Sequence, residues 1–112
     1  MSIVSGPFTI MDYEKDCFRI KVSGQLTGAE AALLRMEVAE SACNGYDVIY
    51  LDAKEVTEMD LSGINEVINS HYTLDKASKK LIFLYKKDSP VESWVATTAL
   101  DKFVATAIVP AS

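Results

Sequence analysis

The spacing of apolar residues along the chain changes period several times, and each change predicts an element. In residues 8–11 and again in residues 18–23, apolar and polar residues alternate. Phe18, Ile20 and Val22 therefore fall on one side of the second segment and polar residues on the other. A period of two with one polar face predicts an antiparallel hairpin, with an acidic turn over residues 12–16.

A first helix is predicted after the hairpin, and Gly24 is expected to end the preceding strand. Residues 27–30, TGAE, have the form of a capping box. In such a box the Thr27 hydroxyl accepts a hydrogen bond from the amide of Glu30, and the Glu30 carboxylate accepts one from the amide of Thr27. Asn44-Gly45 is expected to end this helix. Its apolar stripe consists of Ala31, Leu34 and Val38.

Three later segments are predicted to be strands. Residues 48–51 and 81–85 are apolar throughout, which is typical of strands that are covered on both faces. The first run is expected to end at Asp52. Residues 104–109 form a last short strand, which Pro110 ends.

Two more helices are predicted between these strands. Helical spacing of apolar residues extends over residues 61–76. Ser89 and Glu92 form a second capping box, with Pro90 at the first helical position, where its missing N–H costs nothing. The order ββαβαβαβ predicts a single α/β domain over residues 1–112. We expect a mixed β-sheet that opens with the hairpin at one edge, with helices packed against it.

Composition and charge narrow the classes of function. The chain has 112 residues, 49% of them hydrophobic, which suffices for one core without disulfides or metals. A net charge of −5 with mixed signs predicts no binding to nucleic acid and favours a protein partner with a basic surface. Without a signal-peptide pattern or a membrane-length apolar run, we expect a cytoplasmic protein with no membrane insertion. Cys17 and Cys43 form no CxxC pair and are expected to be reduced thiols.

Few residues offer catalytic or metal chemistry. His71, the only histidine, lies within a predicted helix and has no cysteine or acid at metal-ligand spacing, so we expect no metal site and no cofactor. Asp52 ends a strand, as the phosphoacceptor of a receiver domain does, but a receiver does not open with a hairpin. An enzyme that used Asp52, Asp60 and Ser62 would lack an activated nucleophile unless Ser62 were hydrogen-bonded to His71.

The segment over residues 56–63 is the most informative. Asp60 is a suitable N-cap for the helix that follows, because its carboxylate can accept from the amide of Ser62 or Gly63. Gly63 has poor helix propensity in the first turn. A small residue there indicates either close packing or a helix start that must stay open to a partner.

The run VIYLDAKEVTEMDLSGINEVI, in its ββαβαβαβ setting, resembles the STAS domain of anti-sigma factor antagonists. In that family a strand ends in Leu-Asp or a similar pair, and Asp-Ser-Ser-Gly opens the next helix. A Gly-x-Leu loop often precedes the first helix. The resemblance covers residues 8–109. The matching residues are Gly24, Leu26, Leu51, Asp52, Asp60, Ser62 and Gly63.

The resemblance implies a binding protein rather than an enzyme. Members of the family bind a kinase-like anti-sigma factor through the helix start, and phosphorylation of the first serine ends the binding. A phosphate there would add nearly two negative charges beside Asp60. The partner-binding residues implied here are Gln25, Glu58, Met59, Asp60, Leu61, Ser62 and Gly63.

This sequence departs from the family in two places. Leu61 stands where the phosphorylated serine is expected, and it has no hydroxyl. Ser62 is the remaining candidate for phosphorylation, but its side chain points about 100° further round the helix, which favours a small polar residue without that role. The chain also stops after its last predicted strand, as in STAS subunits of lipid-asymmetry ABC transporters. Binding to the ATPase subunit of such a transporter is the alternative function.

Overall fold

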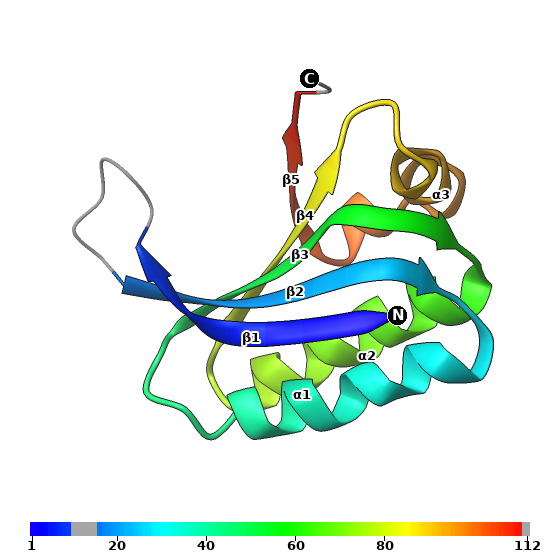
Figure 1. The fold of residues 1–112 in the computed structure, drawn as a ribbon. Coiled ribbons are helices and arrows are strands. Elements are labelled where there is room, and N and C mark those ends of the chain that lie inside the picture. The colour runs from blue at the N-terminus through cyan, green and yellow to red at the C-terminus, as the bar shows by residue number, and fades with distance from the viewer. Residues whose placement is uncertain (10–15, 111–112) are drawn as a thin grey trace.

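The computed structural model describes residues 1–9 and 16–110, with the backbone alone for Phe8, Thr9 and Asp16. The predicted order ββαβαβαβ is confirmed (Figure 1). The acidic turn predicted over residues 12–16 lies outside the described residues, apart from the backbone of Asp16. In chain order the elements are β1 (Ser2–Thr9), β2 (Asp16–Leu26), the 3₁₀ helix η1 (Gly28–Leu33), α1 (Leu34–Ser41), β3 (Val48–Met59), α2 (Leu61–Lys76), β4 (Lys80–Lys86), α3 (Pro90–Thr98), the 3₁₀ helix η2 (Leu100–Lys102) and β5 (Ala105–Val109).

The strands form one mixed sheet in the order β1-β2-β3-β4-β5. β1 pairs with β2 in antiparallel fashion, and the three remaining pairs are parallel. The predicted sheet is therefore confirmed, with the first hairpin strand at one edge. The two apolar runs are inside the sheet, where Leu51 of β3 lies opposite both Ile20 of β2 and Phe83 of β4.

Two predicted strand ends are wrong. β2 does not end at Gly24 but continues to Leu26; Gly24 adopts a φ of +87°, and the register against β3 shifts between Gly24 and Gln25. A glycine in such a position marks a bulge rather than an end. β3 does not end at Asp52 but continues to Met59. Its second half pairs with β2 alone and still buries Ala53, Val56 and Met59, so both strand pairing and burial continue past Asp52.

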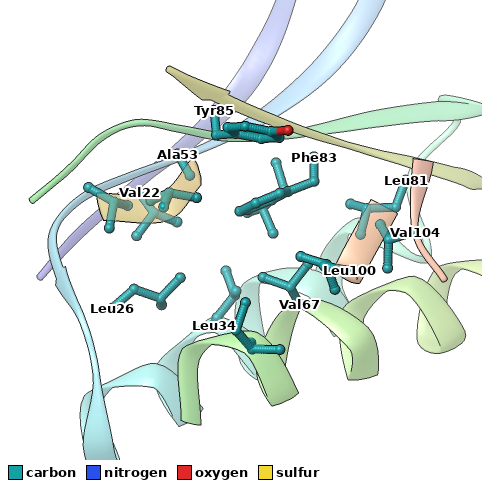
Figure 2. Close-up of a cluster of buried hydrophobic side chains, with 14 of the residues drawn as sticks. Val22, Leu26, Leu34, Ala53, Val67, Leu81, Phe83, Tyr85, Leu100 and Val104 are labelled. Carbon is teal, nitrogen blue, oxygen red and sulfur yellow. The ribbon is translucent and has the colours of Figure 1, made fainter. Parts of the chain in front are cut away.

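The prediction that both apolar strands are covered on two faces is also wrong. In β4, buried Leu81, Phe83 and Tyr85 alternate with the half-buried Ile82 and Leu84. Helices α1, α2 and α3 contribute to one buried cluster, which lies between helices and sheet (Figure 2). The other face of the sheet is open. Neighbouring side chains half-bury the residues on that face, which is enough for apolar residues to occur there. The sequence of the strand therefore shows no alternation of apolar and polar residues.

The capping box predicted at residues 27–30 does not form. Thr27 precedes η1 with an extended backbone, and its hydroxyl makes no capping hydrogen bond. The Glu30 carboxylate instead lies 3.4 Å from the terminal amine of Met1. The first helical segment therefore opens as a 3₁₀ helix and becomes α-helical only at Leu34. α1 ends at Ser41, shortly before the predicted stop at Asn44-Gly45.

The cap predicted for the third helix is confirmed. The Ser89 hydroxyl accepts from the amide of Glu92 at 3.3 Å, and Pro90 occupies the first helical position. The Glu92 carboxylate accepts from the amide of Asp88 at 3.1 Å rather than from that of Ser89. The reciprocal bond of the predicted box is thus displaced by one residue.

Candidate functional site

Asp60 joins the starts of two helical segments. It is the N-cap of α2, with Oδ1 accepting a hydrogen bond from the amide of Gly63 at 3.1 Å, as predicted. Its second oxygen, Oδ2, accepts from the amide of Gly28, the first residue of η1, at 3.1 Å. One carboxylate therefore fixes the start of α2 to the loop that follows β2. No local sequence pattern indicates the second bond, because its partners are 32 residues apart.

Gly63 allows α2 to pack closely against the end of β2. The residue is buried, and a Cβ added to it would overlap the carbonyl oxygen of Leu26. This overlap is with the backbone, which cannot move aside as a flexible side chain can. Of the two reasons considered for a small residue here, close packing is the one that the structure bears out.

The surface at the start of α2 contains five of the seven predicted partner-binding residues. Gln25, Glu58, Leu61 and Ser62 are exposed, and Asp60 is half-buried. The sheet brings the first two together, because Gln25 of β2 lies opposite Glu58 of β3. We call these five residues the α2-start surface.

Two of the predicted residues are not on this surface. Met59 is only 4% exposed and belongs to the hydrophobic core, although the resemblance implied that it binds the partner. In the second half of β3 every third side chain is buried, from Ala53 through Val56 to Met59, whereas the neighbouring Glu58 is exposed. Gly63 is also buried. Leu61, by contrast, is 57% exposed, which is high for a leucine in a domain with an apolar core.

A salt bridge beneath this surface holds α2 against α1. Arg35 Nε donates to one oxygen of Glu66 at 3.0 Å, and its Nη2 lies 2.7 Å from the other. The Glu66 side chain is 6% exposed. This bidentate contact, through its hydrogen bond first and its charge second, raises the pKa of Arg35. The two helices are thereby fixed side by side.

The structure does not place His71 next to Ser62. His71 is nine residues further along α2, about 13 Å along the helix axis, and packs against the ring of Tyr72 with centroids 5.3 Å apart. Within residues 1–9 and 16–110, Ser62 and His71 share no hydrogen bond, and no cluster of potential metal ligands is present. Cys17 is buried and Cys43 is exposed.

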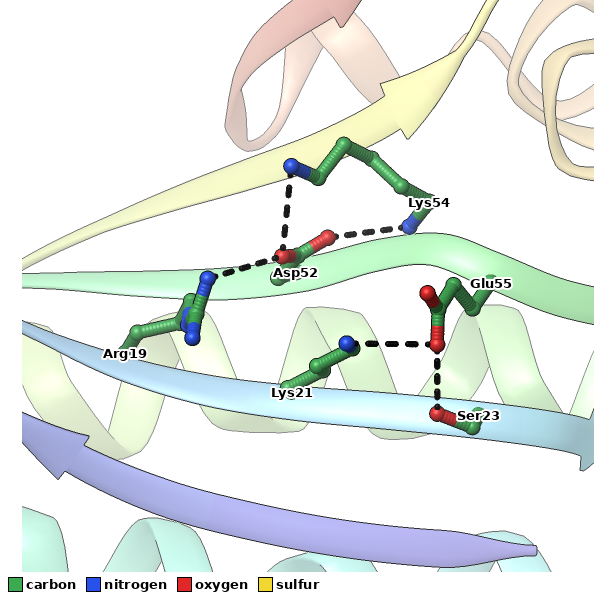
Figure 3. Close-up of polar contacts among 6 residues, drawn as sticks. All are labelled: Arg19, Lys21, Ser23, Asp52, Lys54 and Glu55. Atoms are coloured by element: carbon green, nitrogen blue, oxygen red, sulfur yellow. Dashed lines mark hydrogen bonds and ion pairs between the residues drawn. The ribbon is translucent and has the colours of Figure 1, made fainter.

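Asp52 belongs to an ion-pair network on the open face of the sheet (Figure 3). Its Oδ2 lies 3.8 Å from Arg19 Nη1 and 3.6 Å from Lys54 Nζ, and its Oδ1 accepts from the amide of Lys54 at 3.0 Å. Both oxygens are engaged by these donors and the side chain is 2% exposed, so Asp52 is poorly placed to act as a nucleophile. The receiver-like role considered for Asp52 is therefore not supported.

The network continues on β2 and β3 beside Asp52. Lys21 Nζ lies 3.2 Å from Glu55, and the Ser23 hydroxyl donates to the same carboxylate at 3.3 Å. The Lys21 hydrogen bond and charge lower the pKa of Glu55. In the sequence, Arg19 and Lys21 are distinguished only as polar residues of an alternating strand. Their partners lie on another strand, which alternation along one strand does not reveal.

Known proteins share the fold at low sequence identity. No protein-family model matches the chain, and no curated protein does. The structure of the unphosphorylated anti-sigma factor antagonist SpoIIAA matches with a TM-score of 0.67 and 14% identity, over 97% of this chain and 89% of that one. An anti-sigma factor antagonist from Mycobacterium paratuberculosis gives 0.72 and 15%, over 94% and 85%. A putative anti-sigma factor antagonist from Thermotoga maritima gives 0.70 and 17%, over 96% and 86%.

At 14–17% sequence identity, these structural matches establish the shared fold alone. Among the described residues, no helix combines the length and the apolar character needed to cross a membrane. The chain has the SpoIIAA-like STAS fold that the sequence pattern predicted.

Proposed function

We propose that this chain is a regulatory binding protein, not an enzyme, whose α2-start surface binds a kinase-like anti-sigma factor. The observation that carries the proposal is Leu61, an exposed apolar side chain on a rigid helix start. It occupies the position at which the resembling family carries its phosphorylated serine. Such a partner would place the protein in the cytoplasm.

The rigidity of this surface favours binding. The two hydrogen bonds of Asp60 and the contact between Gly63 and Leu26 fix the helix start before any partner arrives. A pre-ordered surface loses little conformational entropy on association. Complete burial of Leu61 against a partner contributes up to about 2 kcal/mol. Leu61 therefore strengthens the complex that a phosphoserine would break.

The proposal includes the loss of the phosphorylation switch. Leu61 has no hydroxyl, so a kinase-like partner finds no acceptor at the expected position. Ser62 is exposed, but its hydroxyl is about 100° further round the helix. We expect the complex to persist in the presence of ATP.

The test is affinity capture with the purified chain as bait, followed by mass spectrometry of the bound proteins. Leu61→Asp places a second carboxylate beside Asp60 and is expected to abolish capture of the partner. Leu33→Asp is the matched control, because Leu33 is 55% exposed and lies outside the α2-start surface. Equal capture by both variants would place the interface elsewhere. Capture of an ABC-transporter ATPase would favour the alternative partner.

Intact-mass measurement tests the missing switch. After incubation with ATP and the captured partner, the wild-type chain is expected to stay unmodified and Leu61→Ser to gain one phosphate. A phosphate on the wild-type chain that maps to Ser62 would mean that the switch is displaced by one residue and not lost.

A further inference from the structure

A hollow of about 570 Å³ opens on the uncovered face of the sheet. Its polar lining comes from three strands and consists of Arg19, Lys21, Asp52, Lys54, Glu55 and Lys86. Val109 and Pro110 form an apolar edge. Figure 3 shows five of the polar residues on β2 and β3, with their charged groups directed toward one another.

The charge of this hollow is opposite to that of the chain. Four cationic side chains and two carboxylates give it a net charge of +2, whereas the whole chain carries −5. Four of the 11 lysines and arginines are thus gathered in one place. Cations this close repel one another, so their clustering costs stability unless something offsets it.

Asp52 supplies part of that compensation and orders the cations. Its carboxylate is buried between Arg19 and Lys54 and holds the charged groups of both side chains close to it. The Lys54 ammonium has three N–H donors, so it keeps donors for an acceptor besides Asp52. Within the described residues no carboxylate pairs with the ammonium of Lys86, which lines the hollow from β4. The hollow therefore offers ordered cations, with donors remaining on Lys54, and the ammonium of Lys86, which no described carboxylate neutralises.

We propose that this hollow binds the phosphate group of a phosphate monoester. A monoester carries up to two negative charges, which match the net charge of +2, and three acceptor oxygens suit donors that converge from separate strands. The hollow lies toward the carboxyl ends of β4 and β5, the end of a parallel sheet at which α/β proteins commonly bind ligands. Val109 and Pro110 would contact the organic part of the ligand.

The proposal does not rest on the proposed function. The hollow and the α2-start surface share no residue. Loss of ligand binding in the hollow and loss of partner capture at Leu61 are therefore separate results.

The test is an NMR titration of the ¹⁵N-labelled chain with phenyl phosphate at pH 7.5 and constant ionic strength. Saturable shifts are expected at the amides of Arg19, Lys54 and Lys86. Lys86→Gln is expected to raise Kd about tenfold, the equivalent of one lost charge-assisted hydrogen bond. Lys86→Arg keeps the charge and should keep binding. Lys87→Gln is the matched control, because Lys87 is the next residue, is exposed and does not line the hollow.

A second arm distinguishes a soluble monoester from a lipid headgroup. Vesicles of phosphatidylcholine with added phosphatidic acid, a monoester lipid, are sedimented with the protein, and pure phosphatidylcholine vesicles serve as control. If the chain sediments with the acidic vesicles and the Lys86→Gln substitution abolishes this sedimentation, the site binds a lipid headgroup. Linear shifts without saturation, equal losses in the Lys86→Gln and Lys87→Gln variants, or no binding in either arm would overturn the proposal.

Discussion

The starts of α2 and η1 lie side by side, yet they are capped in different ways. α2 is capped locally, by the carboxylate of Asp60 three residues before Gly63. η1 receives no cap from Thr27, and the amide of its first residue, Gly28, donates to the same Asp60 from 32 residues away. A helix start that is satisfied by a distant residue has no local signature in the sequence.

A third helix start shows why the local rule failed at Thr27. Ser89 and Thr27 both begin an S/T-x-x-E segment, but only Ser89 caps its helix. Pro90 follows Ser89 and has its φ fixed at a helical value. Gly28 follows Thr27 and adopts a φ of +53°, which turns the chain away from the helical path. The capping box therefore depends on the residue at the first helical position as well as on its two named members.

The largest expected effect is that of Gly63→Ala. Alanine has better helix propensity by about 1 kcal/mol, but its Cβ would overlap the Leu26 carbonyl. We expect a net loss of about 2–3 kcal/mol in the free energy of unfolding, measured by urea denaturation. Gly45→Ala is the control, because an added Cβ meets no atom there. A more stable Gly63→Ala variant would show that the contact with β2 is not close.

Asp60→Ala is expected to have the next largest effect. It removes the cap of α2 and the acceptor of Gly28 together, at a cost of about 2 kcal/mol. Asp60→Ser keeps an oxygen for the Gly63 amide but none for Gly28, so about half of that loss is expected. Equal unfolding free energies for the two variants would mean that the bond to Gly28 contributes nothing.

The two S/T-x-x-E segments should respond differently to loss of their hydroxyls. Ser89→Ala removes a cap and is expected to cost about 1 kcal/mol. Thr27→Ala removes no capping bond and is expected to cost under about 0.5 kcal/mol. Thermal unfolding followed by circular dichroism compares the two variants. A larger loss for Thr27→Ala would contradict the 3₁₀ start seen here.

The smallest expected effect concerns pH and the Glu55 carboxylate on the open face, which the side chains of Lys21 and Ser23 contact. Since Lys21 lowers the pKa of Glu55 below its ordinary value of 4.5, this pair stabilises the folded chain above that pH. The contribution is lost as the pH falls through the lower folded-state value. Glu55→Gln should therefore narrow the stability difference between pH 7 and pH 3 slightly, as measured by urea denaturation. An unchanged difference would show that the exposed pair has no effect on stability.

The sequence by itself determined the order of elements, the mixed sheet and the bounds of α2. Periods of two and of 3.6 residues are local properties, and so are the caps at Asp60 and Ser89, because each joins residues three positions apart. The local resemblance around Asp60 also led to an architecture that known structures share. Leu61 and Ser62 could be placed on the surface from the same segment.

Only the tertiary structure decided the continuation of β2 and β3, the single covered face of the sheet and the details of both candidate sites. Met59 is buried because pairing with β2 carries β3 on to that residue, and Gly63 is required because the backbone of Leu26 lies against it. The cations around Asp52 come from three strands that parallel pairing aligns. Each of these features depends on residues that are distant in the chain. Such contacts arise from packing and strand register, which no local spacing of residue types specifies.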